Sequence, residues 1–485
     1  MTVQSVLDDI ASRPGAGDVI PIINPATEEV LAEFRDGGAD AVDAAVTRAR
    51  ESFTSGVWSG LPGSERAKVL WRVADLIDQH ADELAQIDSL NTGMPYFQAF
   101  MIMSTCAESF RYYAGWCTKL NGIAHDVQQT GGITGAFTNM HAYTLKEPYG
   151  VVGLIFPWNG PVFNACTKLA PALAAGCSCI VKPAEETPLS ALLLERILAE
   201  AGVPDGVVNL VTGYGHTAGA AITAHPGVDK VAFTGSTTVG KQIVQAAGGG
   251  NLKRVALELG GKSPVLIYDD ADLGTAITMA AMGIFIHSGQ GCISGSRIFA
   301  QRSVFERVVE GVTNIANSVR LGAPSEDGVL IGPIISAKQL DQVLGFIEGG
   351  RRDGVEVVTG GRRLDRSGFF VHPTVLTDVA PTARLYQQEI FGPVVAILPF
   401  DDDDEVVALA NDSEYGLAAT AWTKDIGRAH RLAKRLDAGT VTLNCQMVFD
   451  HAMPFGGYKQ SGWGHEWGRD GIESFLKTKT VYAQL

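Results

Sequence analysis

The chain of 485 residues is long enough for two or three domains, each with a core of its own. Hydrophobic residues make up 46% of it and charged residues 19%, which is ordinary for a soluble globular enzyme. The formal net charge of −15 and the lack of a long basic run argue against nucleic acid or an anionic membrane as a partner.

The cysteines and the N-terminus indicate the compartment. The seven cysteines are odd in number and scattered, unlike a disulfide framework. The N-terminus has no basic region followed by an apolar core, and no apolar run is long enough to span a membrane. We therefore expect a protein of the reducing cytoplasm.

No metal site is predicted, because the acidic run Asp401–Glu405 suits the start of a helix better than a metal.

The first 120 residues are predicted to be helical after one hairpin. The hairpin is Pro21–Phe34, with Asn24-Pro25 as its turn. Helical spacing of apolar residues follows over Asp40–Gly56, Ser64–Leu90 and Tyr96–Leu120. The last of these helices carries aromatic residues whose spacing indicates core packing rather than a binding platform: Phe97, Phe100, Phe110, Tyr112, Tyr113 and Trp116.

The segment Thr130–Lys146 interrupts this pattern. It is glycine-rich and then alternates between apolar and polar residues, which indicates a hairpin. Because it belongs to neither neighbouring core, we expect it to project and to pair with another subunit.

From Val151 onward, short apolar runs alternate with helical patterns, which predicts a parallel sheet covered by helices on both faces. The predicted strands are Val151–Phe156, Ser178–Val181, Val207–Val211, Lys230–Phe233 and Arg254–Leu257. The predicted helices are Pro161–Ala175, Pro188–Ala201, His216–Ala224 and Thr238–Ala247. Ligands of such sheets bind beyond the carboxyl ends of the strands.

Polar residues and glycines follow all five predicted strands. Gly235-Ser236 opens a helix and can place backbone N–H groups on a pyrophosphate. The usual G-x-G-x-x-G fingerprint is absent, so the spacing predicts a nucleotide without deciding between a mononucleotide and a dinucleotide.

The second half, from Asp269 to Gly439, is predicted to form another α/β unit. It begins with an apolar helix, Gly274–Ile286, that leads into a loop containing Cys292 among three glycines, Gly289, Gly291 and Gly295. A thiol in such a loop can be reached by a substrate and is a nucleophile if its thiolate is stabilised. From this loop alone the alternative is favoured, since a free cysteine is more usually a small buried residue that only fills space.

Several motifs, in this order and register, resemble the NAD(P)-dependent aldehyde dehydrogenase superfamily over nearly the whole chain. They are Pro157-Trp158-Asn159, Lys182-Pro183-Ala184-Glu185, Phe233-Thr234-Gly235-Ser236, Glu258-Leu259-Gly260-Gly261, Gly289-Gln290-Gly291-Cys292, Glu389-Ile390-Phe391-Gly392 and Pro454-Phe455-Gly456-Gly457. The resemblance implies an α/β fold with a Rossmann-like NAD-binding domain, an α/β catalytic domain and a small β oligomerisation unit. The implied ranges are 1–125 and 148–258, then 259–460, and last 126–147 with 472–485. The resemblance also implies a homodimer or homotetramer.

The resemblance implies catalytic roles for five residues. Cys292 resembles the nucleophile and Asn159 the oxyanion donor, which acts with the backbone N–H of Cys292. Glu258 resembles the base that activates the deacylating water. Lys168 and Glu466 match a proposed proton relay, although a buried structural ion pair explains them as well.

The implied cofactor is NAD rather than NADP, because Glu185 would accept from a ribose 2′-hydroxyl and repel a 2′-phosphate. The residues expected to contact it are Ile155, Phe156, Pro157, Trp158, Lys182, Ala184, Glu185, Gly215, Phe233, Thr234, Gly235, Ser236, Val239, Gly240, Leu259, Glu389 and Phe391.

On the family pattern, an apolar tunnel for a small-molecule aldehyde would be lined by Phe163, Met282, Ile286, Ile293 and Phe449. No Arg or Lys occurs in Cys445–Met453, so a neutral aliphatic or aromatic aldehyde is predicted. Two alternatives stay open: a CoA-acylating enzyme, whose relatives usually lack a glutamate at Glu258, and a non-catalytic protein on the same fold. The chain departs from the family pattern at Gly160, Gly291 and Trp467, the last standing where leucine is commoner.

Overall fold

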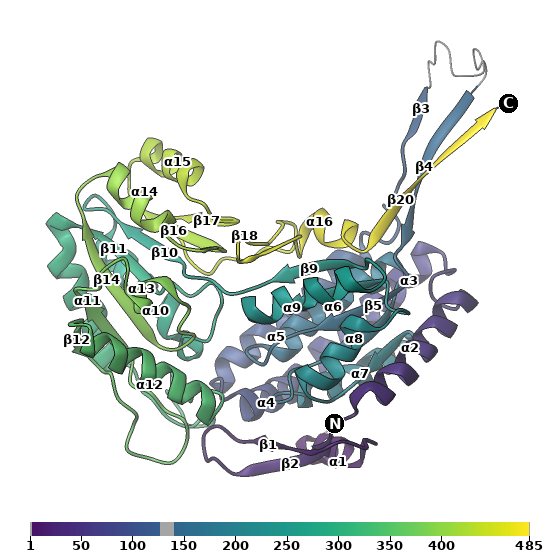
Figure 1. The fold of residues 1–485 in the computed structure, drawn as a ribbon, viewed down its shortest axis with the longest axis horizontal. Helices are drawn as coiled ribbons and strands as arrows, with labels where there is room; N and C mark the ends of the chain where they lie inside the picture. The colour runs from purple at the N-terminus through teal and green to yellow at the C-terminus, as the bar shows by residue number, and fades with distance from the viewer. Residues whose placement is uncertain (1, 127–139, 485) are drawn as a thin grey trace.

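The computed structural model describes residues 2–126 and 140–484 and contains two large sheets, each flanked by helices. A third, narrow sheet projects from the first one as an arm (Figure 1). The predicted α/β class is confirmed. Among the described residues, no helix is both long and apolar enough to cross a bilayer.

The first sheet has six strands. In spatial order they are β19 (Gly462–Trp463), β9 (Arg254–Glu258), β8 (Lys230–Thr234), β5 (Val151–Ile155), β6 (Ser178–Lys182) and β7 (Val208–Leu210). All pairs are parallel except β19 with β9. Every residue of β5 and β6 is buried, which is why these strands read as unbroken apolar runs.

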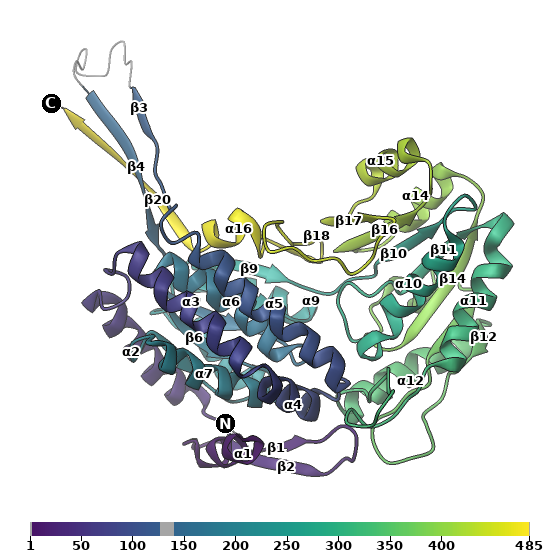
Figure 2. The same ribbon diagram turned by 180° about the vertical axis from the view of Figure 1, so that it is seen from behind.

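Helices cover both faces of this sheet, as predicted. One face carries α2 (Gly38–Ser55), α8 (Ala220–Ala224) and α9 (Thr237–Gly249), with a π-helical turn η1 (Gly215–Gly219) before α8. The other carries α6 (Pro161–Ala175) and α7 (Leu189–Ala201), with α1 (Val3–Ser12), α3 (Gly63–Gln79), α4 (Ala81–Thr92) and α5 (Tyr96–Ala114) outside them (Figure 2).

Most N-terminal predictions hold, although α5 ends at Ala114 rather than at the predicted Leu120, and two predictions need correction. The hairpin forms from β1 (Val19–Ile23) and β2 (Val30–Arg35). The single helix predicted over Ser64–Leu90 is wrong, because His80 leaves helical geometry (φ −104°, ψ 19°) and separates α3 from α4. This break lets both helices pack on α5.

The second correction concerns the aromatic residues of α5. Phe110 and Tyr113 are fully buried, as predicted. Phe97 and Phe100 are 45% and 46% exposed, so the prediction that they belong to the core is wrong. Both lie on the face of α5 that also carries the exposed Met101, whereas Ala99 and Met103 on the other face are buried.

The second sheet has seven strands, parallel except for the β12–β13 pair. They are β12 (Glu356–Thr359), β13 (Thr374–Thr377), β14 (Val394–Phe400), β11 (Arg297–Gln301), β10 (Pro264–Ile267), β16 (Ala418–Trp422) and β17 (Thr440–Leu443). On one face lie α10 (Leu273–Phe285) and α11 (Phe305–Ser318), the latter preceded by η3 (Arg302–Val304). On the other lie α12 (Ala337–Arg352), α13 (Arg384–Gln387), α14 (Asp403–Asn411) and α15 (Ile426–Arg435). Asp402 caps α14, in agreement with the interpretation of the acidic run as a helix start.

After β17 the chain returns to the first sheet. In this returning segment β18 (Tyr458–Lys459) pairs with the earlier strand β15 (Tyr415–Gly416). The next strand, β19, then adds to the edge of the first sheet beside β9. The short helix α16 (Gly468–Glu473) follows. Residues 444–475 therefore bridge the two sheets, as Figure 1 shows.

The arm consists of β3 (Ala124–Asp126), β4 (Met140–Pro148) and the C-terminal β20 (Leu476–Gln484), in the order β20-β4-β3. All its pairs are antiparallel. Of the predicted hairpin Thr130–Lys146, the residues from Met140 to Lys146 lie in one sheet with the C-terminal strand. The hairpin's residues 130–139 lie outside the described residues.

Candidate active site

The loop that carries Cys292 is shaped by glycine at two points. It follows α10 through a tight turn, η2 (Ile286–Gly289), in which His287 and Ser288 have positive φ. At Gly289 (φ +68°) a Cβ would lie 2.1 Å from the carbonyl oxygen of Gly392. This close approach excludes any side chain and fixes the loop against the segment that carries Glu389.

The residues that follow β9 lie in close contact with the same loop. A Cβ on Gly261 would lie 2.2 Å from the carbonyl oxygen of Cys292, and one on Gly260 would lie 2.3 Å from Oε2 of Glu389. The two adjacent glycines therefore allow the Glu258 segment, the Cys292 loop and the Glu389 segment to meet at one place.

This setting disfavours the thiolate of Cys292. The residue is partly exposed, yet the protein around its sulfur raises the pKa of the thiol from 9.0 to about 12. Burial is the largest cause, and the carboxylates of Glu389, Glu258 and Glu466 add to it. Without a bound ligand the sulfur therefore carries its proton at neutral pH.

Glu258 is the last residue of β9 and is 5% exposed. Burial, with a contribution from Glu466, raises the pKa of its carboxyl group well above the usual value, while Lys168 opposes this. Its Oε2 atom has no hydrogen-bond partner among the described residues. Such a carboxyl group is suited to accept a proton from water at its free oxygen.

Asn159 follows β5 and faces the cysteine loop. Its Nδ2 donates to the carbonyl oxygen of Gln290 at 2.8 Å, which leaves a second N–H on the same nitrogen. Gln290 is fully buried and is held by the backbone N–H of Ile335, which donates to its Oε1 at 2.9 Å. The amide of Asn159 is thus anchored two residues before Cys292 in the chain.

Lys168 and Glu466 form an ion pair between α6 and the returning segment. Lys168 is 1% exposed and also donates to Oγ1 of Thr234 at 2.7 Å. The structure therefore brings both residues to the Glu258 side of the site, since both affect the pKa of that carboxyl group.

The residues expected to bind the cofactor gather at the carboxyl ends of the first sheet. Ser236 caps α9, with its hydroxyl accepting from the N–H of Val239 at 3.3 Å. Lys182 ends β6 and lies 3.6 Å from the carboxylate of Glu185. The other members lie at these same strand ends and in the first turns that follow: Ile155, Phe156, Pro157, Ala184, Gly215, Phe233, Thr234, Gly235, Gly240 and Leu259.

Three further features fit a dinucleotide in this place. A Cβ on Gly215 would meet no atom within 4 Å, and Val239 is 40% exposed at the first turn of α9, so this edge offers open space. The carboxyl group of Glu389 accepts from the N–H of Gly261 at 2.9 Å, and burial raises its pKa to about 7. Trp158 and Phe391 meet edge to face at 5.2 Å.

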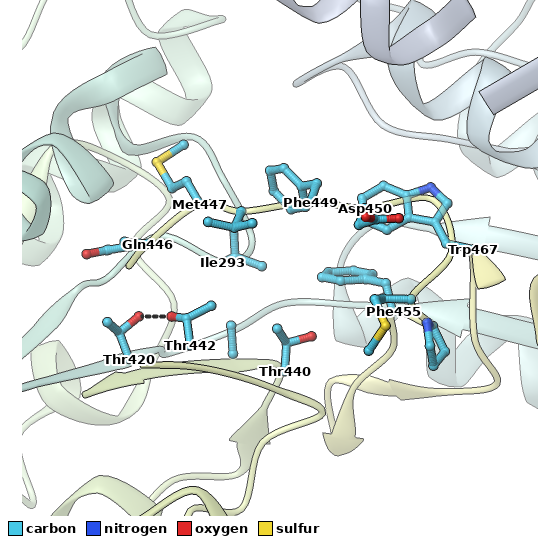
Figure 3. A pocket seen from close by; sticks show the side chains of 14 residues that line it. Ile293, Thr420, Thr440, Thr442, Gln446, Met447, Phe449, Asp450, Phe455 and Trp467 are labelled. Carbon is cyan, nitrogen blue, oxygen red and sulfur yellow. Dashed lines mark hydrogen bonds between the residues drawn. The ribbon is translucent and has the colours of Figure 1, made fainter. Parts of the chain in front are cut away.

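A cavity of about 540 Å³, its open mouth included, lies beside the cysteine loop (Figure 3). Ile293, the residue after Cys292, is in its wall together with Phe449. Phe163 contacts its edge through the ring of Trp467, at 5.9 Å. Met282 is not among its lining residues.

Some residues of the cavity were not among the predicted site residues. They include Thr420, Thr440, Thr442, Gln446, Phe455 and Trp467. Phe455 could have been found through its place in the Pro454-Phe455-Gly456-Gly457 motif, and Trp467 through its departure from the family pattern. The threonines lie on β16 and β17, where they resemble ordinary strand residues.

Comparisons with known proteins identify the family. The model of the aldehyde dehydrogenase family matches residues 12–481. Retinal dehydrogenase 2 of Homo sapiens is 43% identical over 472 residues, 97% of this chain and 89% of that protein. Aldehyde dehydrogenase 1 of Tanacetum cinerariifolium is 42% identical over 467 residues, 96% and 92% of the two chains.

Solved structures give the same result. The NAD+ complex of aldehyde dehydrogenase from Bacillus cereus superimposes with a TM-score of 0.95 at 44% identity, covering 100% of this chain and 98% of that one. The chain therefore belongs to the aldehyde dehydrogenase family and oxidises an aldehyde to its carboxylic acid with NAD.

Proposed function

We propose that the substrate is a neutral aliphatic or aromatic aldehyde and that Cys292 attacks it. The observation that carries this proposal is the cavity beside the cysteine loop. Most of its lining residues are apolar, and its one charged residue is an acid, Asp450. An aldehyde with its own carboxylate would need a cation there and would instead meet a negative charge.

In the first step the sulfur of Cys292 adds to the carbonyl carbon and loses its proton. The oxyanion of the thiohemiacetal would accept hydrogen bonds from Nδ2 of Asn159 and from the N–H of Cys292. A donor of this kind lowers a barrier by about 3–4 kcal/mol. The high pKa of the thiol means that a base must take its proton, and the carboxylate of Glu258 is near enough to raise that pKa.

Loss of a hydride from the thiohemiacetal carbon gives a thioester, which water hydrolyses in the second half of the reaction. NAD, when bound, accepts the hydride that leaves the carbonyl carbon. Glu258 would then take a proton from the attacking water through its unpartnered oxygen. Glu466, paired with Lys168, would receive that proton next; both residues lie close enough to Glu258 to affect the pKa of its carboxyl group.

The cofactor would be held along the first sheet. The first turn of α9, with Gly235 and Ser236, suits the pyrophosphate. Lys182 and Glu185 suit the adenosine ribose, and Glu389 with Phe391 suits the nicotinamide end. The carboxylate of Glu185 supports NAD over NADP.

We further propose the domain division and the assembly. Residues 1–125 and 148–258 would bind NAD, and 259–460 would form the catalytic domain. The arm, 126–147 with 472–485, would join subunits into a homodimer or homotetramer. The seven cysteines are all free thiols, which supports a cytoplasmic location.

The test measures NADH formation with hexanal, benzaldehyde and succinate semialdehyde. We expect kcat/KM for the two neutral aldehydes to exceed that for succinate semialdehyde by at least about 100-fold. Cys292→Ala should abolish NADH formation. Cys445→Ala, which removes another partly exposed free cysteine, should keep it.

A preference for succinate semialdehyde would overturn the substrate class. Full activity in Cys292→Ala would overturn the assignment of the nucleophile.

A further inference from the structure

Trp467 is held in an unusual backbone conformation. Its φ is +60° and its ψ is 179°, a region that large side chains rarely adopt. Such a conformation costs free energy and persists only where the surroundings hold it, and it is found most often at functional sites. Trp467 is 4% exposed, so the packing around its indole contributes to this hold.

Four aromatic rings surround the indole. The rings of Phe163, Phe449 and His451 meet it edge to face, with centroids 5.9, 5.4 and 5.7 Å away, and that of Phe455 lies 5.3 Å away at a tilt. Phe163 belongs to α6, whereas the other three rings belong to the segment 444–475. The indole therefore fills the space between α6 and that segment.

A side-chain hydrogen bond holds the indole, and two backbone hydrogen bonds hold the residue before it. Its Nε1 contacts Oγ1 of Thr167 at 3.4 Å, and Thr167 lies one helical turn after Phe163 on the same face of α6. Glu466, the residue before Trp467, exchanges two backbone hydrogen bonds of 2.7 Å with Phe455. The indole is thus held by a side-chain contact with α6, and the backbone just before Trp467 is held by its pairing with Phe455.

The indole also forms one end of the cavity. Figure 3 shows Trp467 with Phe455 and Asp450 at one end, opposite Thr420 and Gln446 at the other. A leucine at this position would leave the space of most of the indole empty. The space available to an aldehyde side chain is therefore limited by Trp467.

We propose that Trp467 is a specificity-determining residue that sets the largest aldehyde side chain the cavity accepts. The inference rests on the proposed function, because it takes the cavity as the aldehyde site. Its physical basis is that four rings pack on the indole, and that backbone hydrogen bonds hold the residue before it in place. A substrate too long for the cavity would have to displace this whole cluster.

The test compares kcat/KM for 3-phenylpropanal and for propanal in the full-length enzyme. Trp467→Leu should raise the ratio of the two values by about tenfold or more, because it gives the longer aldehyde room and deprives the shorter one of contact. Trp467→Phe, which keeps an aromatic ring of smaller size, should shift the ratio in the same direction by a smaller factor.

The matched control is Trp463→Leu. Trp463 lies four residues earlier on the same segment, is 52% exposed and is not in the lining of the cavity. Its replacement should leave the ratio unchanged. Circular dichroism of each variant confirms that it is folded, and if Trp467→Leu does not fold, Trp467→Phe decides the question.

An unchanged ratio in a folded Trp467 variant, with an active wild type, would overturn the inference. An equal shift of this ratio in Trp463→Leu would overturn the inference as well. A wild type that oxidises neither aldehyde would instead contradict the proposed substrate class, so the two failures can be told apart.

Discussion

At the scale of single residues, three carboxyl groups lie close enough to one thiol to affect its pKa. Glu389, Glu258 and Glu466 all raise the pKa of Cys292, and burial raises the pKa of Glu258 and Glu389 in turn. Cys292, Glu258 and Glu389 therefore resist ionisation in the enzyme without its ligands. This arrangement protects the thiol from unwanted reactions, because the thiolate is the reactive form.

We predict that Glu389→Gln makes Cys292 react faster with iodoacetamide above pH 7. The carboxyl group of Glu389 has a pKa of about 7, so above that pH it is negative and opposes the thiolate. Removing the charge lowers the pKa of Cys292 and should raise the alkylation rate by up to about tenfold, the effect of one pKa unit. Below pH 7 the wild type carries a neutral Glu389, so the two rates should converge.

The measurement is the rate of iodoacetamide incorporation at Cys292 from pH 6 to pH 9, followed by mass spectrometry. Glu414→Gln, which removes an exposed carboxylate of the same region, serves as the control and should leave the rate unchanged. A slower reaction in Glu389→Gln above pH 7 would contradict the prediction.

At the scale of elements, the proposed cofactor site includes the start of a helix at a strand end. Helices α9 and α12 both begin with a serine whose hydroxyl accepts from the N–H three residues on, at 3.3 Å in each case. Ser236 begins α9 at the edge of the first sheet, whereas Ser336 begins α12 on the second sheet. The same local motif thus occurs once at the proposed pyrophosphate site and once away from it.

We predict that Ser236→Ala and Ser336→Ala each lower the free energy of unfolding by about 1 kcal/mol, since each removes one helix cap. Only Ser236→Ala should weaken NAD binding, because the hydroxyl and the first turn of α9 face the proposed cofactor. Urea unfolding and isothermal titration with NAD give the two quantities. Equal losses of NAD affinity in both variants would show that the cap acts only through stability.

At the scale of the whole molecule, the arm joins distant parts of the chain. Strand β20 pairs with β4 over nine residues, from Leu476 with Pro148 to Gln484 with Met140. Tyr482 and Leu145 on this small sheet are 65% and 40% exposed, and Ile123, the residue before β3, is 71% exposed. Exposed apolar side chains on a projecting sheet support its proposed role in subunit contact.

We predict that a chain ending after Phe475 is monomeric, because it lacks β20 and leaves β4 without its longest pairing. Size-exclusion chromatography with light scattering measures the mass. Lys479→Ala is the control: it removes only the exposed pair with Glu147, worth about 0–1 kcal/mol, and should keep the wild-type mass. A truncated chain with the wild-type mass would exclude the arm as the main subunit contact.

Local patterns in the sequence were sufficient to predict most elements. The five parallel strands and α6 were predicted within about two residues of their bounds, because buried parallel strands and amphipathic helices have distinct apolar periods. The motif residues around Cys292, Glu258 and Asn159 were identified from their order along the chain. The break at His80 was not predicted, since neither glycine nor proline marks it and the packing of α3 and α4 on α5 produces it.

The sequence by itself determined the class of fold, the family and the chemical groups of the site, because these depend on local periods and on contiguous motifs. Only the tertiary structure decided which distant residues meet: Glu466 with Lys168, Gly261 with the backbone of Cys292, and Trp467 with the rings of α6 and the segment 444–475. The exposure of Phe97 and the raised pKa of Cys292 were likewise decided there. The physical reason is that burial and electrostatic contacts depend on the neighbours in space, which the order of residues along the chain does not specify.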